Sequence, residues 1–221
     1  MPVTKQFLWH LTGMAIHGLV LSGPWIIARY LDPEFSLSWA ALLLWCVIVL
    51  VGLTESIVSR RCTSRQPVRV FGESLSPSIG FALLIVFWLS LMSVALCNTI
   101  SALSTAVGIG LVSCGVCFRL AAILKLRAFF ISELGLFNHH PLITDGIYSR
   151  TRNPAELGTL TLALGTVVYA GSTSGAWMFL TVLMPLITWR IFREEGMLKE
   201  AFSTHYDDYQ QHTPRLIPFP R

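Results

Sequence analysis

Long apolar stretches separated by short polar joints constrain the fold of this chain more than any other feature. A helix needs roughly 20 apolar residues to cross the hydrocarbon core of a bilayer. The candidate stretches, the last two of them shorter, are Thr12 to Leu31, Leu37 to Val58, Ser78 to Ile100, Leu103 to Leu124, Leu157 to Tyr169 and Gly175 to Trp189. Because helices satisfy their own backbone hydrogen bonds in lipid, the pattern predicts an all-α, polytopic transmembrane bundle of about six spans.

The composition favours a membrane protein over a nucleic-acid-binding one. Apolar residues make up 53% of the 221 residues and charged residues only 13%, whereas soluble domains carry about 25% charged residues. The net charge of +4 is spread over the joints between apolar stretches, and no dense basic run occurs. We therefore expect the lipid bilayer, and no nucleic acid, as a partner.

The basic residues also predict an orientation. Arginine and lysine are concentrated in the loop after the second stretch, the loop after the fourth and the C-terminal tail. The other joints are poor in cations, apart from Arg29. Since cytoplasmic loops carry the excess of Lys and Arg, six spans with both termini in the cytoplasm are expected.

Neither the cysteines nor the histidines predict a metal site. Cys114 and Cys117 form a C-x-x-C inside an apolar stretch without a second pair, and zinc sites of this kind need more ligands. His139 and His140 are adjacent, and adjacent side chains rarely face one ion. We expect no metal.

Polar residues gather at the ends of the last two apolar stretches. Glu156 opens the fifth stretch and Arg190 closes the sixth. The short link from Ala170 to Ser174 predicts a helical hairpin, which brings both ends to the same side. Arg190 and Glu194 are four residues apart, on one helix face. This pattern fits either a site for a small charged ligand or a salt bridge at a helix end, and the residues alone favour neither.

Two ordered motifs resemble the isoprenylcysteine carboxyl methyltransferase family. His140-Pro-Leu-Ile-Thr-Asp-Gly-Ile-Tyr148, followed by Arg152-Asn-Pro-Ala-Glu-Leu-Gly158, is similar to the family pattern H-x-L-V-T-x-G-x-Y-x-x-x-R-H-P-x-Y-x-G. Arg190-Ile-Phe-Arg-Glu-Glu195 is similar to the family's R-I-x-x-E-E-x-x-L. With the upstream Gly115-x-x-x-Arg119, the resemblance extends from Gly115 to Pro218.

The resemblance implies a membrane methyltransferase that uses S-adenosylmethionine and acts on a lipid-like or prenylated substrate. Residues 1–114 are then N-terminal transmembrane helices. Residues 115–221 form the methyltransferase core, in which the connecting loop and a C-terminal amphipathic helix form a cytoplasmic cofactor pocket. Carried over by position, the cofactor-binding residues are His140, Pro141, Leu142, Ile143, Tyr148, Asn153, Pro154, Ala155, Glu156 and Glu194. Arg190 corresponds to the substrate-binding arginine, and Arg190 and Glu194 are the expected catalytic residues.

Two positions depart from the family pattern and bear on the substrate. Asn153 stands where the family has histidine, and Glu156 stands where it has tyrosine. Asparagine can replace one hydrogen bond of histidine, whereas glutamate adds a charge that suits the ammonium of the cofactor.

We also expect Tyr206 and Tyr209 to anchor an interfacial helix in the membrane.

The expected chemistry needs positioning more than proton transfer. Methyl transfer from a sulfonium to a carboxylate joins a cation and an anion, so a dry site favours it. Because a carboxylate is ionised at neutral pH, the protein has to orient the two reactants rather than supply a base. We expect Arg190 to bind the carboxylate in a bidentate contact and Glu194 to bind the amino group of the cofactor.

Three alternatives stay open at this point. A phospholipid amine acceptor on the same fold would need a base, for which His140, His205 and Glu156 are available. A membrane reductase using NADPH has a similar C-terminal pattern, although the chain has no G-x-G-x-x-G fingerprint. A small transporter or non-catalytic partner would carry polar residues near mid-membrane, where the apolar stretches here are nearly bare.

Overall fold

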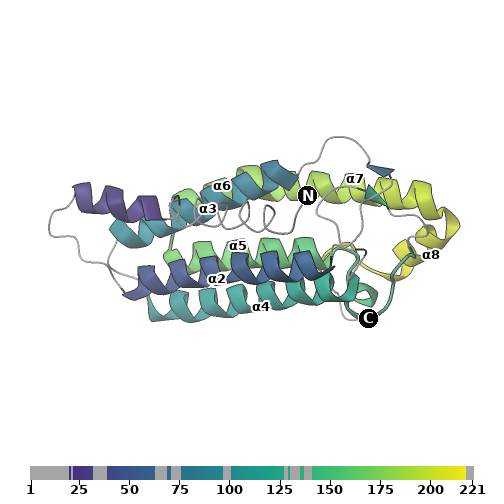
Figure 1. The fold of residues 1–221 in the computed structure, drawn as a ribbon, viewed down its shortest axis with the longest axis horizontal. Coiled ribbons are helices and arrows are strands. Elements are labelled where there is room, and N and C mark those ends of the chain that lie inside the picture. The colour runs from purple at the N-terminus through teal and green to yellow at the C-terminus, as the bar shows by residue number, and fades with distance from the viewer. Residues whose placement is uncertain are drawn as a thin grey trace, which may run out of the picture.

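Helices dominate the computed structural model, which describes residues 20, 22–31, 39–62, 69–70, 76–96, 101–126, 129, 135–136 and 141–217. They run roughly along the long axis of an elongated bundle (Figure 1). In chain order the helices are residues 22–31, α2 (Trp39–Cys62), α3 (Ser76–Leu96), α4 (Ala102–Leu126), α5 (Pro154–Ala170), α6 (Thr173–Met178), the π-helical turn η3 (Phe179–Leu183), α7 (Met184–Phe202) and α8 (Thr204–His212). A 3-10 turn, η2 (Gly146–Ser149), precedes α5.

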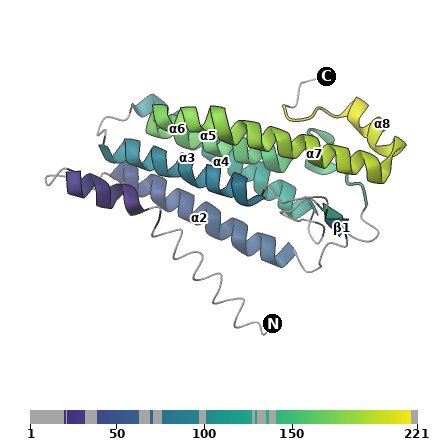
Figure 2. The same ribbon diagram turned by 90° about the horizontal axis from the view of Figure 1, so that it is seen from above.

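One short strand pair is added to the helices that the sequence predicts. Strand β1 (Arg69–Val70) pairs antiparallel with β2 (Gly135–Leu136), with Arg69 opposite Leu136. The two strands come from the two connecting loops that the sequence marks as basic. The pair therefore joins these loops at one end of the bundle, the end at which α8 also lies (Figure 2).

Three helices of the described part are long and apolar enough to cross a membrane. They are Ser76–Leu96, Ala102–Leu126 and the continuous helix Thr173–Phe202, while the apolar part of α2, Trp39–Thr54, is shorter. The prediction of an all-helical membrane bundle is thereby confirmed in outline. The count of six spans and the cytoplasmic termini stay predictions, and most of the predicted span from Thr12 to Leu31 lies outside the described residues.

The predicted hairpin is present, but its second arm is longer than expected. Gly171 ends α5 in the left-handed conformation (φ 57°), and the Ser172 hydroxyl caps α6 by accepting from Gly175 N at 3.1 Å. The helix that begins at Thr173 continues to Phe202, well beyond the predicted end at Trp189. The charged residues after Trp189 end the apolar stretch without ending the helix, because several of them are paired inside the protein.

Helices α4 and α5 approach each other closely through glycines spaced seven residues apart. Gly108 and Gly115 on α4 face Gly158 and Gly165 on α5. A Cβ atom on Gly115 would lie 2.5 Å from the backbone nitrogen of Leu162, closer than side chains tolerate. Small residues of this kind let membrane helices pack backbone against backbone. This contact holds the start of α5 in place.

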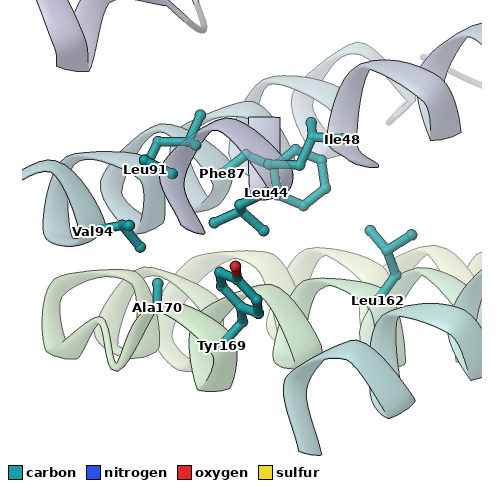
Figure 3. Close-up of a cluster of buried hydrophobic side chains, with 9 residues drawn as sticks. Leu44, Ile48, Phe87, Leu91, Val94, Leu162, Tyr169 and Ala170 are labelled. Atoms are coloured by element: carbon teal, nitrogen blue, oxygen red, sulfur yellow. The ribbon is translucent and has the colours of Figure 1, made fainter. Parts of the chain in front are cut away.

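Two apolar clusters fill the bundle. In the first, Leu44 and Ile48 of α2 face Phe87 of α3 and Leu162 and Tyr169 of α5 (Figure 3). The second joins α3, α5, η3 and α7 through a set of buried side chains that includes Val86, Ala163, Leu183, Ile187 and Ile191. Other large apolar side chains are exposed on the outside of the bundle, including Trp39, Phe81 and Trp177, as expected for a surface that faces lipid.

Candidate active site

Arg190 is the centre of a charged cluster formed by three helices. Its Nε atom lies 3.3 Å from Oε1 of Glu156, at the start of α5, and 4.0 Å from Oε2 of Glu194, one turn along α7. Its Nη1 atom donates to the Ser76 hydroxyl at the start of α3, at 2.6 Å. The side chains of Arg190 and Glu156 are 12% and 15% exposed. The predicted proximity of Glu156, Arg190 and Glu194 is confirmed.

Several polar atoms of this region lack hydrogen-bond partners among the residues that the structure describes. They are Arg190 Nε, Glu194 Oε2, and the Nε and Nη1 atoms of Arg152, all of which are buried. Although Arg190 Nε is close to Glu156, the two are not aligned for a hydrogen bond. A buried polar atom without a partner costs about 1–3 kcal/mol. These atoms can therefore accept or donate hydrogen bonds to a group outside the described residues, and a bound molecule is one such group.

Glu195 lies beside this cluster and has a different role. Its carboxylate is 6% exposed and lies between two guanidinium groups. Arg152 Nη2 is 3.3 Å from Oε1, and Arg215 contacts Oε2 through Nη2 at 2.9 Å and donates to it from Nε at 3.0 Å. One carboxylate thus links the segment that leads into α5 with the C-terminal tail.

Further hydrogen bonds join the same two segments, which we call the loop–tail clasp (residues 148–153 and 209–215). The backbone nitrogen of Arg152 donates to the carbonyl of Pro214 at 3.0 Å. The Thr151 hydroxyl and the Asn153 side-chain amide both donate to the carbonyl of Arg215, at 3.2 and 3.0 Å. The Asn153 amide, expected to contact the cofactor, is therefore engaged in holding the tail.

The tyrosines of α8 face inward, so the prediction that they anchor the helix in the membrane interface is wrong. Tyr206 is 1% and Tyr209 8% exposed, and their ring centroids lie 6.0 Å apart. The Tyr209 hydroxyl donates to the carbonyl of Tyr148 at 2.6 Å and so strengthens the clasp. Burial, followed by the nearby charge of Glu195, raises the pKa of Tyr206 to about 12.

Tyr148 connects the clasp with the Arg190 cluster. Burial raises the pKa of its hydroxyl, and the carboxylates of Glu156 and Glu194 raise that pKa further. A phenol that resists ionisation remains a hydrogen-bond donor at neutral pH. Tyr148 therefore presents a neutral polar group beside two carboxylates.

The segment before α5 is fastened to the end of α4. Lys125 Nζ lies 2.6 Å from Oδ2 of Asp145, and this contact lowers the pKa of the Asp145 carboxyl. Gly146 follows with a positive φ of 66°, which glycine adopts without strain. Six residues before Lys125 on α4, Arg119 Nη1 donates to the Thr159 hydroxyl of α5 at 2.6 Å. These contacts fix the approach of the loop to the site.

The other residues expected to bind the cofactor lie around the same end of the bundle. Leu142 and Ile143 are half-buried and Pro141 is exposed, in the segment before η2. Pro154 and Ala155 are buried in the first turn of α5, where proline is favoured. His140 lies outside the described residues.

Sequence reasoning missed three contributors to this region. Ser76 approaches from α3, far away in the chain, and no local pattern marks it. Thr151 and Arg215 belong to segments that the motifs include. The proline-bounded basic tail of the family pattern could have indicated Arg215. Among the described residues, no group of three or more His, Cys, Asp or Glu side chains is placed to hold a metal ion.

Comparisons with known proteins show which families the chain resembles. Residues 103–205 match the family model described as phospholipid methyltransferase. The chain is 27% identical to a protein-S-isoprenylcysteine O-methyltransferase of Schizosaccharomyces pombe, over 96% of this chain and 87% of that protein. It is 31% identical to protein-S-isoprenylcysteine O-methyltransferase B of Arabidopsis thaliana, over 51% of this chain and 58% of that protein. It is 30% identical to the Mus musculus protein-S-isoprenylcysteine O-methyltransferase, over 66% of this chain and 50% of that protein.

A solved structure shares the fold. The eukaryotic intramembrane Ras methyltransferase ICMT (isoprenylcysteine carboxyl methyltransferase) superposes with a TM-score of 0.61 at 18% identity, covering 99% of this chain and 87% of that chain. At this identity the likeness shows a common fold. Together with the relatives, it confirms the resemblance to the isoprenylcysteine carboxyl methyltransferase family and the related phospholipid methyltransferases that the motifs predicted.

Proposed function

We propose that this chain is an integral membrane methyltransferase that transfers a methyl group from S-adenosylmethionine to the carboxylate of a lipid-like or prenylated acceptor. The curated relatives named above are O-methyltransferases, which confirms the prediction of an enzyme. The observation that carries the proposal is the buried cluster of Arg190, Glu156 and Glu194, in which Arg190 Nε and Glu194 Oε2 lack hydrogen-bond partners among the described residues.

The residues of this cluster fit the proposed cofactor. S-adenosylmethionine carries an ammonium and a sulfonium, and the Oε2 atom of Glu194, which has no hydrogen-bond partner among the described residues, is an acceptor suited to the ammonium. Tyr148 and Glu156 supply a neutral donor and a second carboxylate beside it. Leu142 and Ile143 offer half-buried apolar surface for the adenosine part. When bound, the cofactor supplies an electrophilic methyl group.

The remaining proposed cofactor contacts come from the two motifs. They are His140, Pro141, Asn153, Pro154 and Ala155, all of which belong to the segment that leads into α5 or to its first turn. We propose that the loop–tail clasp, together with α8, closes this segment over the cofactor. The clasp is supported by the contacts of Glu195 with both segments.

Arg190 and Glu194 are the proposed catalytic residues. Arg190 would hold the acceptor carboxylate in a charge-assisted contact, and the buried cluster would keep water away while opposite charges meet. Since the carboxylate is ionised at neutral pH, no general base is needed, and correct placement of the reactants supplies the rate enhancement. The apolar exterior of the bundle suits an acceptor with a lipid tail.

We further propose six spans with both termini in the cytoplasm, which would put the Arg190 cluster at the cytoplasmic end of the bundle. The distribution of arginine and lysine among the loops supports this orientation. Residues 1–114 would then act as N-terminal transmembrane helices and residues 115–221 as the methyltransferase core. The close contact of α4 with α5 within the core supports the division, because it holds the helix that carries Glu156.

Methylation of a phospholipid amine is a second candidate function. It is favoured by the description of the matching family as phospholipid methyltransferases, and by the two carboxylates that face one guanidinium in the cluster. An amine has to lose a proton before or during transfer, and a carboxylate can accept it. A labelled methyl group that survives mild base would indicate this function, whereas a methyl ester is cleaved by base.

Binding of S-adenosylhomocysteine to the purified protein, measured by calorimetry, tests the proposal. We expect one binding event in the wild-type protein and at least a tenfold loss of affinity in Glu194→Ala, because a charge-assisted hydrogen bond is removed. Glu200→Ala is the matched control, since Glu200 is exposed on the same helix. Absence of binding to the wild-type protein, for both this compound and S-adenosylmethionine, would overturn the proposed function.

A further inference from the structure

Glu156 contacts the guanidinium of Arg190, the group that an acceptor carboxylate would need. The Glu156 Oε1 atom lies 3.3 Å from Arg190 Nε, with both side chains largely buried. Arg190 Nη1 already donates to the Ser76 hydroxyl at 2.6 Å. The Nε edge of the guanidinium is therefore the edge available for a two-pronged contact with a carboxylate, and Glu156 lies on that edge.

The charges of the cluster make the entry of a second anion unfavourable. Glu156 and Glu194 both face Arg190, so two carboxylates accompany one guanidinium. Like charges at close range in a partly buried site repel strongly, because the effective dielectric constant is low there. An acceptor carboxylate consequently has to displace Glu156 from Arg190 or bind beside it.

The contact between Glu156 and Arg190 is suited to displacement. At 3.3 Å it is an ion pair, but Arg190 Nε has no aligned hydrogen bond within the described part of the chain. Well-made contacts between arginine and carboxylate are shorter, about 2.7–2.9 Å, and are frequently bidentate. An acceptor carboxylate that makes such a contact gains hydrogen bonds that Glu156 does not make.

We infer that Glu156 is a specificity-determining residue that competes with the acceptor carboxylate for Arg190. This inference rests on the proposed function, because it assumes that Arg190 receives an acceptor acid. Glu156 weakens the binding of anionic acceptors and leaves uncharged analogues of the same shape unaffected. Tyrosine, which the family pattern has at this position, carries no charge at neutral pH and does not compete in this way.

Steady-state kinetics with an N-acetylated S-prenylcysteine as acceptor test the inference. In Glu156→Gln, we expect the KM for this acid to fall about tenfold, because the acid no longer has to displace a charged carboxylate from its ion pair with Arg190. The inhibition constant of the corresponding primary amide, which is uncharged, stays within about twofold of its wild-type value. The affinity for S-adenosylhomocysteine does not rise, so the lower KM for the acid is caused by the acceptor site and not by tighter cofactor binding. Glu200→Gln, the exposed control on α7, leaves all three quantities unchanged.

The outcomes separate the inference from the function on which it rests. If the wild-type protein methylates the acid but the KM of Glu156→Gln is unchanged or higher, the inference is overturned and the function stands. Equal changes for the acid and the amide would also overturn it, because they indicate a structural effect. Glu156→Tyr serves as a second variant if Glu156→Gln does not fold, with the same fall in KM expected. A wild-type protein without turnover would instead contradict the proposed function.

Discussion

Substitution of Gly158 by alanine is expected to force α4 and α5 apart and to damage the site. A Cβ atom at this position would lie 2.7 Å from the backbone nitrogen of Arg119 and from the carbonyl oxygen of Gly115. These distances are about 0.7 Å shorter than an ordinary van der Waals contact, and the opposing atoms belong to backbone that cannot turn aside. Overpacking of this kind typically costs about 1–3 kcal/mol.

The matched control is Gly110→Ala on α4. A Cβ atom at Gly110 would meet no atom within 4 Å, and replacing a helical glycine by alanine gains about 1 kcal/mol in helix propensity. Both variants share this gain, so the difference between them isolates the overpacking at Gly158. We expect Gly158→Ala to be less stable than Gly110→Ala by about 1–3 kcal/mol.

Thermal unfolding in detergent, followed by tryptophan fluorescence, measures this difference. For a chain of this length each kcal/mol corresponds to about 2–4 °C, so we expect Gly158→Ala to unfold roughly 2–12 °C below Gly110→Ala. Because Glu156 lies two residues before Gly158, the affinity for S-adenosylhomocysteine should fall as well. Equal unfolding temperatures for the two variants would show that the helices are not in backbone contact at Gly158.

Three further predictions concern the surroundings of the site. Glu195→Gln should destabilise the protein by about 3 kcal/mol, because it leaves the buried guanidinium of Arg152 without its carboxylate, and should speed proteolysis within the tail; the exposed Glu200→Gln should do neither. The contact with Lys125 lowers the pKa of Asp145. The ion pair therefore stabilises the protein above the ordinary pKa of aspartate, and this stabilisation is lost as pH falls through the lowered pKa. Between pH 6 and pH 3, the unfolding temperature should fall less in Asp145→Asn than in the wild-type protein. The pKa of Tyr206 is raised to about 12, so its contribution to stability is present below about pH 10 and is lost as pH rises towards 12. Over that window, the stability of Tyr206→Phe should fall less steeply with pH than that of the wild-type protein. Identical pH dependence in the two proteins would contradict the raised pKa of Tyr206.

The sequence predicted the bundle and the meeting of Glu156 with Arg190, because hydropathy and a short turn determine both. An apolar run long enough to cross a bilayer has few alternatives to a helix. A hairpin through Gly171 then returns the chain, so the start of the fifth stretch and the end of the sixth meet on one side. Hydropathy did not predict the true end of the last long helix at Phe202. The helix continues beyond its apolar part through charged residues that form ion pairs inside the protein.

The contacts that depend on tertiary structure could not be predicted. The role of Glu195 depends on two arginines from separate segments, and its neighbour Glu194 looks the same in the sequence. Tyr206 and Tyr209 have the spacing of interfacial anchors, yet they are buried because the tail folds back over the loop. The pairing of Gly115 with Gly158 becomes visible only when the two helices are side by side.

Transfer of a tritiated methyl group from S-adenosylmethionine, in membranes that contain the protein and an N-acetylated S-prenylcysteine, tests whether this protein methylates a lipid-like carboxylate. We predict label in the prenylated product that mild base releases as methanol, and loss of this label in Arg190→Leu but not in Glu200→Gln. Absence of transfer, or label that resists base and resides in a phospholipid head group, would contradict methylation of a lipid-like carboxylate by this protein.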